Sequence, residues 1–256
     1  MKKLFKAFFM CLSMFTRIPP LYNKWDEEAK DYIILFLPII GLIIGSIHYL
    51  IYYLLTLVNL PYLVNALILF IYPFLITGFI HLDGFMDTVD GISSYKPLDE
   101  RIRILKDSHV GSFSVISVVL LLLSNFVLYS SLNIDTNYLF LFFTPVTSRI
   151  LSSLSITIFK PLTVSEYNKV EEKNRLKIFK IIFFITLLVI DLVLCYIFSG
   201  LYVFVQVFLI ILYLLTILLS VKSFKGINGD MCGHALTISE SLSLILIIVF
   251  EVLRWI

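Results

Sequence analysis

The sequence predicts an all-α fold: a polytopic transmembrane bundle of about seven helices with its N-terminus in the cytoplasm. Two observations predict it. Of the 256 residues, 59% are hydrophobic and only 15% are charged, and the mean hydropathy is +0.98. A soluble domain carries about 25% charged residues, so this chain has too little charge for a surface that faces water. We expect the lipid bilayer to surround it, with residues 1–256 as one integral membrane domain.

Seven segments hold the roughly 20 mainly apolar residues that a membrane-crossing helix needs. In chain order they are 32–58, 61–81, 113–132, 138–159, 178–198, 202–221 and 235–253. Three of the joins between them are short and contain no Lys or Arg: 59–61, 133–137 and 199–200. The remaining connecting segments are longer and basic. We therefore expect the short connections and the basic connections on opposite sides of the membrane.

The basic residues decide the orientation. Of the 20 Lys and Arg residues, 18 lie in or beside the longer segments 1–31, 82–112, 160–177 and 222–234. Seven spans place all four segments on one side, and the positive-inside rule makes that side the cytoplasm. We therefore expect 1–31 to be a cytoplasmic or interfacial segment, 82–112 to be a cytoplasmic catalytic loop, and the C-terminus to lie outside.

The polar stretch that follows the second span carries three acids at helical spacing. Asp83, Asp87 and Asp90 are placed i, i+4 and i+7, which puts them on one face of a helix. Carboxylates so close together repel one another, and Mg²⁺, which prefers oxygen ligands, offsets that repulsion. A solvated acidic helix end is the plainer interpretation. The apolar Phe85 and Met86 between the acids weigh against it.

Two polar turns are candidates for phosphate binding. Lys106, Asp107, Ser108 and Gly111 form a turn that offers charge, a hydroxyl group and backbone access to a phosphate. The plainer interpretation is a polar turn that leads into the third span.

The second turn opens the last span. Asn228, Gly229 and Asp230 stand where a helix begins, and helix N-termini present free N–H groups to anions. The alternative is an ordinary tight turn in which Asp230 is the N-cap.

Charged groups inside the spans are costly and are expected to face the bundle interior. Arg149 and Glu240 either pair with each other or reach a substrate, whereas no motif surrounds Asp191. His48 lies in an apolar run and is expected to be a packed side chain. Near the N-terminus, Arg17 is either a positive-inside anchor or a phosphate clamp.

These motifs together resemble the cobalamin synthase family, the adenosylcobinamide-GDP ribazoletransferases. The matching segments are F-T-R-I-P at 15–19, H-L-D-G-x-x-D-T-x-D-G at 81–91, K-D-S-x-x-G at 106–111 and G-x-x-G-D-x-x-G at 226–233. They occur in the family's order, and the resemblance covers nearly the whole chain. Two positions depart from the pattern, since His109 stands where the family usually has Arg and Asn228 where it often has Thr.

The resemblance implies a transferase with Mg²⁺ as cofactor, in the prokaryotic cytoplasmic membrane with its active site facing the cytoplasm. The 5′-hydroxyl of α-ribazole, or the 5′-phosphate of α-ribazole phosphate, attacks adenosylcobinamide-GDP at the corrinoid-side phosphorus, and GMP leaves. The implied metal ligands are Asp83, Asp87 and Asp90. Asp107 and Asp230 complete the metal site or act as general base. The implied phosphate or substrate contacts are Arg17, Lys106, Ser108, Gly111, Asn228, Gly229, Arg149 and Glu240, and His81 is a weaker candidate for the base.

Two other functions are alternatives for an Asp-rich membrane protein. A CDP-alcohol phosphotransferase also uses an Asp-rich membrane helix, but its D-G-x-x-A-R pattern is absent after Asp83. A divalent-cation transporter would place acids deep in several spans around a midplane site. Expected partners are the two small-molecule substrates and the lipid bilayer, not nucleic acid. The identity of the lower base, the number of metal ions and a homo-oligomeric state stay open.

Overall fold

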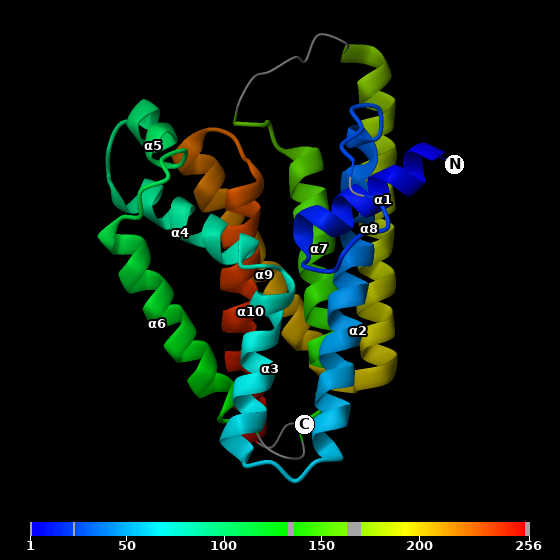
Figure 1. The fold of residues 1–256 in the computed structure, drawn as a ribbon, viewed down its shortest axis with the longest axis vertical. Helices are drawn as coiled ribbons and strands as arrows, with labels where there is room; N and C mark the ends of the chain where they lie inside the picture. The colour runs from blue at the N-terminus through cyan, green and yellow to red at the C-terminus, as the bar shows by residue number, and fades with distance from the viewer. Residues whose placement is uncertain (1, 23, 133–135, 163–169, 254–256) are drawn as a thin grey trace.

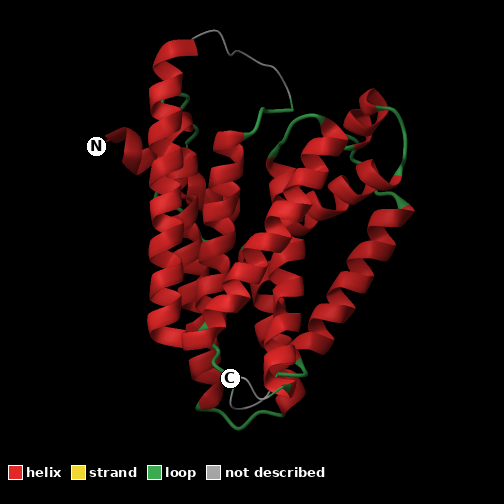
Figure 2. Cartoon of the chain, turned by 180° about the vertical axis from the view of Figure 1, so that it is seen from behind, coloured by secondary structure: helices red, strands yellow, loops and turns green. Residues whose placement is uncertain are grey.

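The chain is an α-helical bundle in a computed structural model that describes residues 2–22, 24–132, 136–162 and 170–253; the side chains of 170–175 lie outside this description. Within the described residues there is no β-strand, only an isolated bridge between Pro161 and Ile227 (Figure 2). The elements are α1 (Lys2–Phe15), η1 (Lys30–Phe36), α2 (Leu37–Thr56), α3 (Tyr62–Ile76), α4 (Ile80–Ser93), α5 (Leu98–Ile104), α6 (Ser112–Tyr129), α7 (Phe140–Ile158), α8 (Val170–Ser199), η2 (Gly200–Tyr202), α9 (Val203–Phe224) and α10 (Gly229–Val252).

The predicted class, a helical membrane bundle, is confirmed. Five helical stretches are long and apolar enough to cross a bilayer: Lys30–Thr56, Ser112–Tyr129, Phe140–Ile158, Leu176–Phe224 and Gly229–Val252. The bent pair formed by α3 and α4 would make a sixth. The 49-residue stretch contains most of α8 and all of α9, so two crossings fit within its length. The count of seven spans stays a prediction.

The predicted span 61–81 is wrong in its extent, because α3 ends at Ile76 and α4 starts at Ile80 with a bend of 81°. Gly78 and Phe79 both adopt left-handed backbone conformations, with φ of 61° and 67°. The N–H of Phe79 donates to the carbonyl of Phe74 at 3.0 Å, and that of Gly78 to Leu75 at 3.1 Å. These two bonds form a Schellman end, which terminates a helix at a left-handed residue, most often glycine.

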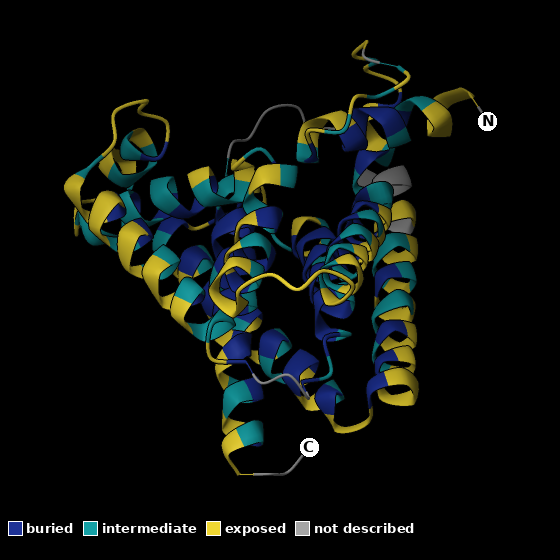
Figure 3. Cartoon of the chain, turned by 60° about the horizontal axis from the view of Figure 1, so that its bottom comes forward, coloured by how far each residue is buried: buried dark blue, intermediate teal, exposed yellow. Residues whose placement is uncertain are grey.

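Helix α7 lies at the centre of the bundle and touches α2 backbone to backbone. Cβ atoms placed on Gly41 and Gly45 of α2 would lie 2.6 Å and 2.3 Å from the carbonyl oxygens of Pro145 and Phe142 of α7. Most of α7 is buried, whereas the outer helices expose their apolar outward faces (Figure 3). Exposed apolar faces of this kind suit a lipid surrounding.

The polar segments gather at one end of the bundle. Helix α1, helix α5 and the turn between α9 and α10 lie at the end opposite the turn that joins α2 to α3 (Figure 1). This agrees with the grouping predicted for segments 1–31, 82–112 and 222–234. In the fourth segment, residues 163–169 lie outside the described part, as does the C-terminal end at 254–256. Which end faces the cytoplasm stays a prediction.

Candidate active site

Helix α4 carries the three predicted acids and lies directly against the first turns of α10. A Cβ atom placed on Gly84 would lie 2.8 Å from the Cα of Asp230, and one placed on Gly233 would lie 3.3 Å from the Cα of His81. The two backbones therefore meet where neither helix has a side chain between them. This contact brings Asp230 of α10 beside the acids of α4, an arrangement that no local sequence pattern indicates.

The acids of α4 and α10 form an uncompensated negative cluster, which we call the carboxylate cluster: Asp83, Asp87 and Asp230. Burial, and to a smaller extent the negative charges of Asp83, Asp230 and Asp90, together raise the pKa of Asp87 to about 6. Asp87 lies in α4, outside the helices that are long enough to span the membrane by themselves. Among the described residues, no ion pair involves a member of the cluster. Such repulsion favours binding of a cation or a proton.

Asp90 faces a different partner, the N-terminus of α6. Its carboxylate accepts hydrogen bonds from the N–H of Gly111 at 2.7 Å, the N–H of Ser114 at 3.0 Å and the hydroxyl of Ser114 at 2.7 Å. A Cβ atom on Gly111 would lie 2.5 Å from the carboxylate, so only glycine permits this approach. Asp90 thus serves as a helix cap supplied from another helix. Its role as a metal ligand stays a prediction, and these contacts argue against it.

The donor atoms of the carboxylate cluster suit Mg²⁺ in kind. Mg²⁺ takes oxygen ligands, usually one or two carboxylates together with substrate phosphates and several waters. Among the described residues, no three His, Cys, Asp or Glu side chains lie close enough to bind one metal ion together. The cluster therefore fits as an incomplete set of ligands, to which water and phosphate oxygens would contribute the rest.

A groove of about 460 Å³ runs beside the carboxylate cluster, between the end of α1 and the turn that joins α3 to α4. Arg17 and Asp83 both line it. The backbone N–H of Arg17 donates to the carbonyl of Ile76 at 2.7 Å. A Cβ atom on Gly78 would lie 2.3 Å from Nε of Arg17, so the guanidinium lies directly over this glycine. The groove thus offers a cation and an anion to the same ligand.

The predicted turn at 106–111 lies mostly in solvent. Lys106, Asp107 and Ser108 are exposed. Asp107 accepts hydrogen bonds from the N–H and from Nδ1 of His109, at 3.0 Å and 2.7 Å, and these bonds hold the pKa of Asp107 below its usual value. Only Gly111 reaches α4, through Asp90. The structure does not bring the other three into the carboxylate cluster, and their roles stay predictions.

The turn at 226–233 is capped by Asn228. The N–H of Met231 donates to Oδ1 of Asn228 at 3.1 Å, and Nδ2 of Asn228 donates to Asp230 at 2.6 Å. The expectation that Asp230 is the N-cap is wrong, because the extended backbone of Asn228 places its amide where a cap is needed. Gly229 is exposed, and a Cβ atom there would meet nothing within 4 Å.

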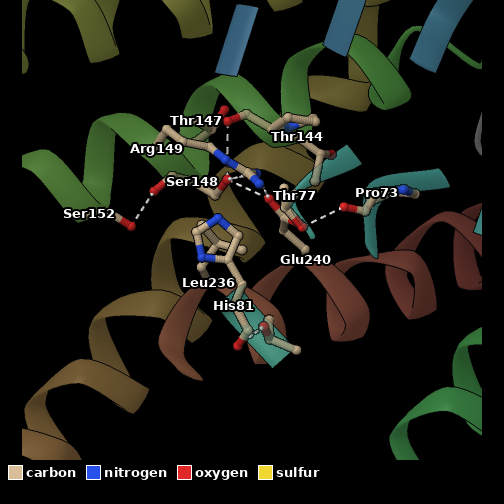
Figure 4. Close-up of polar contacts among 12 residues, drawn as sticks. Pro73, Thr77, His81, Thr144, Thr147, Ser148, Arg149, Ser152, Leu236 and Glu240 are labelled. Atoms are coloured by element: carbon tan, nitrogen blue, oxygen red, sulfur yellow. Dashed lines mark hydrogen bonds and ion pairs between the residues drawn. The ribbon is translucent and has the colours of Figure 1, made fainter. Parts of the chain in front are cut away.

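Arg149 and Glu240 form an ion pair inside the bundle, which confirms one of the two arrangements expected for them (Figure 4). Arg149 is 1% exposed. The hydroxyl of Ser148 donates to Glu240 at 2.5 Å. This interior pair does not lie among the members of the carboxylate cluster, so contact with the reacting phosphates stays a prediction.

The two other ionisable residues singled out within the spans have ordinary partners. Asp191 is buried and accepts a hydrogen bond from Thr147 at 2.6 Å. His48 is packed as expected, with Nε2 2.9 Å from the carbonyl of Leu69.

Three residues that position the site were missed in the sequence: Gly78, Ser114 and Thr237. The hydroxyl of Thr237 donates to the carbonyl of His81 at 3.2 Å. Gly78 lies just after the apolar residues of α3, and a glycine at that position is a usual signal for a helix C-terminus. The other two act on α4 across long sequence separations, and no local signal marks them.

Comparison with known proteins identifies relatives over nearly the full length. Residues 7–248 match the family described as cobalamin-5-phosphate synthase. Relatives described as adenosylcobinamide-GDP ribazoletransferase are 37% identical in Clostridium perfringens (96% of this chain, 99% of the relative) and 37% in Clostridium botulinum (95% and 97%). One from Brevibacillus brevis is 30% identical (94% and 97%). No solved structure matches.

Proposed function

Because the chain belongs to the cobalamin-5-phosphate synthase family, we propose that it joins α-ribazole, or its 5′-phosphate, to adenosylcobinamide-GDP and releases GMP. The chain is a transferase of cobalamin synthesis, and this membership replaces the two alternatives weighed from the sequence. The observation that carries the proposal is the carboxylate cluster, which has no ion-pair partner in the part of the chain that the structure describes and lies beside the groove lined by Arg17.

We propose Mg²⁺ as the cofactor, held by one or two of the carboxylates of Asp83, Asp87 and Asp230 together with water and substrate phosphate oxygens. When bound, the ion neutralises pyrophosphate charge and stabilises the departing GMP. The chemistry of these donors supports the proposal, since three neighbouring carboxylates with no ion-pair partner among the described residues favour a bound cation. Asp230, which the sequence already named as a residue that could complete the metal site, replaces Asp90 among the proposed ligands, because Asp90 is engaged with α6.

The chain's own residues do the positioning that phosphoryl transfer requires. Arg17 binds a phosphate of the donor in the groove. With a 5′-hydroxyl as the acceptor, its oxygen forms a bond to the corrinoid-side phosphorus as the bond from that phosphorus to the GMP oxygen breaks. The hydroxyl proton passes to a carboxylate and then to solvent. We favour Asp230 for this role over Asp107, because Asp107 is exposed and bonded to His109.

We propose that the site faces the cytoplasm. The site lies at the same end of the bundle as α1, α5 and the α9–α10 turn (Figure 1). These segments carry many of the basic residues, and basic residues are enriched on the cytoplasmic side of membrane proteins.

The test is a transferase assay on the purified protein in detergent micelles. With adenosylcobinamide-GDP, α-ribazole and Mg²⁺, GMP and cobalamin should form in equal amounts. Omitting α-ribazole should stop cobalamin formation, and excess EDTA should stop both until Mg²⁺ is restored. Full activity after metal removal would overturn the metal proposal. GMP release without any cobalamin would overturn the assignment as a transferase.

A further inference from the structure

A cavity lies in the middle of the bundle, next to the groove that carries Arg17. It is lined by residues of α2, α3, α4, α6, α7 and α10, among them Arg149, Glu240 and His81. Thr77 lines both the cavity and the groove, so the two adjoin each other at the α3–α4 turn. The cavity therefore adjoins the start of α4, two residues before Asp83.

Two polar atoms beside this cavity are buried without a partner. Nε2 of His81 and Nε of Arg149 have no hydrogen-bond partner among the described residues. Figure 4 shows the imidazole of His81 close to Arg149 and Glu240. Native proteins rarely leave a buried donor or acceptor unpaired, so each such atom calls for a partner that the chain itself does not supply.

The size of the cavity decides what that partner is. The cavity offers about 50 Å³ to water-sized molecules. One water needs about 10–15 Å³ by this measure, and a cavity of about 150 Å³ is the size known to hold benzene. The space thus fits a few waters and is too small for the aromatic base of the acceptor. Its walls also supply the two to four polar partners that each buried water requires.

The remaining contacts of His81 tie it to the orientation of α4. Its carbonyl accepts the hydroxyl of Thr237 at 3.2 Å, its ring stacks on Phe15 of α1, and Gly233 lets α10 approach its backbone. A water cluster that joins the imidazole of His81 to Arg149 and Glu240 would hold the start of α4 on the side that faces the bundle interior.

We propose that the cavity binds an ordered water cluster held by Arg149, Glu240 and His81, and that His81 is thereby a positioning residue for the acids of α4. The positioning role rests on the proposed function, whereas the water site does not. On this proposal Arg149 and Glu240 support α4 from behind and do not contact the substrate.

X-ray footprinting in ¹⁸O-labelled water tests the water site without substrate, because hydroxyl radicals form where water is bound. The test set is three buried residues that line the cavity: Phe140, Leu141 and Leu244. The comparison set is three buried residues that do not line it: Phe184, Leu209 and Tyr213. We expect the first set to be oxidised at least about five-fold faster, because buried water lies beside it. Equal rates in the two sets would show a dry cavity and overturn the proposal.

The positioning role is tested with His81→Leu and His81→Gln. Leucine removes the polar atom that faces the cavity, whereas glutamine keeps a group that can hydrogen-bond to water. We expect His81→Leu to lower kcat about ten-fold with little change in KM, and His81→Gln to recover most of the loss. Unchanged kcat in His81→Leu, or an equal loss in both variants, would overturn the positioning role. Failure of the wild-type assay would instead count against the proposed function and leave the footprinting result intact.

Discussion

Two charged regions of this molecule differ in how their charges are balanced. In the interior pair, Arg149 faces Glu240, and Ser148 bonds to the acid as well. In the carboxylate cluster, no ion pair involves Asp83, Asp87 or Asp230 among the described residues, and their mutual repulsion adds to the raised pKa of Asp87. The charges of the first region balance each other within the protein, and those of the second do not.

The difference separates groups that stabilise the fold from groups that bind a ligand. Buried charge is tolerated only when it is paired, so the loss of either partner of the interior pair destabilises the fold. Uncompensated charge lowers stability and persists at functional sites, where a ligand relieves it. Mutations should therefore have opposite signatures in the two regions, with stability lost in one and activity lost in the other.

The largest effect on stability is expected from Glu240→Gln. It leaves Arg149 buried without a counter-charge, which costs about 3–5 kcal/mol when one partner of a buried pair is removed. Unfolding in detergent micelles measures the loss. The control is Glu100→Gln, the same change in the exposed pair of Lys96 and Glu100, expected to cost at most about 0.5 kcal/mol. Equal losses in the two variants would remove the distinction between the regions.

Asp87→Asn should show the opposite signature. We expect transferase activity to fall at least about 100-fold, since charge stabilisation by a bound metal is worth several kcal/mol. The unfolding temperature should stay the same or rise, because a repelling charge is gone. Asp99→Asn, an exposed acid on α5, is the matched control and should keep its activity. Full activity in Asp87→Asn would show that the cluster does not serve the reaction.

Gly78→Ala tests the groove that serves the cluster. Its Cβ would lie 2.3 Å from Nε of Arg17 and displace the guanidinium, so we expect kcat/KM to fall about ten-fold or more. Gly200→Ala is a closely matched control, because Gly200 has a φ of 59° against 61° for Gly78, and its Cβ would meet nothing within 4 Å. Both variants should lose about 1 kcal/mol of stability. A similar activity in both would mean that the position of Arg17 is unimportant.

The smallest effect on activity is expected from Asp90→Asn. The amide cannot accept all three hydrogen bonds from Gly111 and Ser114, so the cap on α6 weakens and stability falls by about 1–2 kcal/mol. Activity per folded molecule should change less than about ten-fold. Ser114→Ala should cost little more when Asp90 is already replaced, since the two residues share one interaction. A loss of activity as deep as that of Asp87→Asn would restore Asp90 as a metal ligand.

Local patterns in the sequence predicted much of this molecule. Apolar runs predicted the helices, and the positions of Asp83, Asp87 and Asp90 predicted that they share one helix, α4. The pairing of Arg149 with Glu240 was one of two stated possibilities. Each of these follows from helical periodicity or from the cost of charge in an apolar setting.

Contacts between distant segments could not be predicted in the same way. The partners of Asp90 are Gly111 and Ser114, which lie 21 and 24 residues farther along the chain. The carbonyl of His81 accepts a hydrogen bond from the hydroxyl of Thr237, which is 156 residues away. Nothing in the local pattern of α4 indicates these partners. The exchange of Asp90 for Asp230 in the carboxylate cluster follows from the packing of α4 on α10, and a single sequence does not reveal that packing.

The glycine contact between α4 and α10 has a consequence for which ion the cluster prefers. Because the two backbones already touch at Gly84 and Gly233, the helices cannot move closer, and separating them would break their packing. The span between the acids of the two helices is thus nearly constant. Mg²⁺ binds oxygen at about 2.0–2.1 Å and Ca²⁺ at about 2.3–2.6 Å with more ligands. A rigid span discriminates by ionic radius, so we expect the larger ion to be a poor substitute for the smaller.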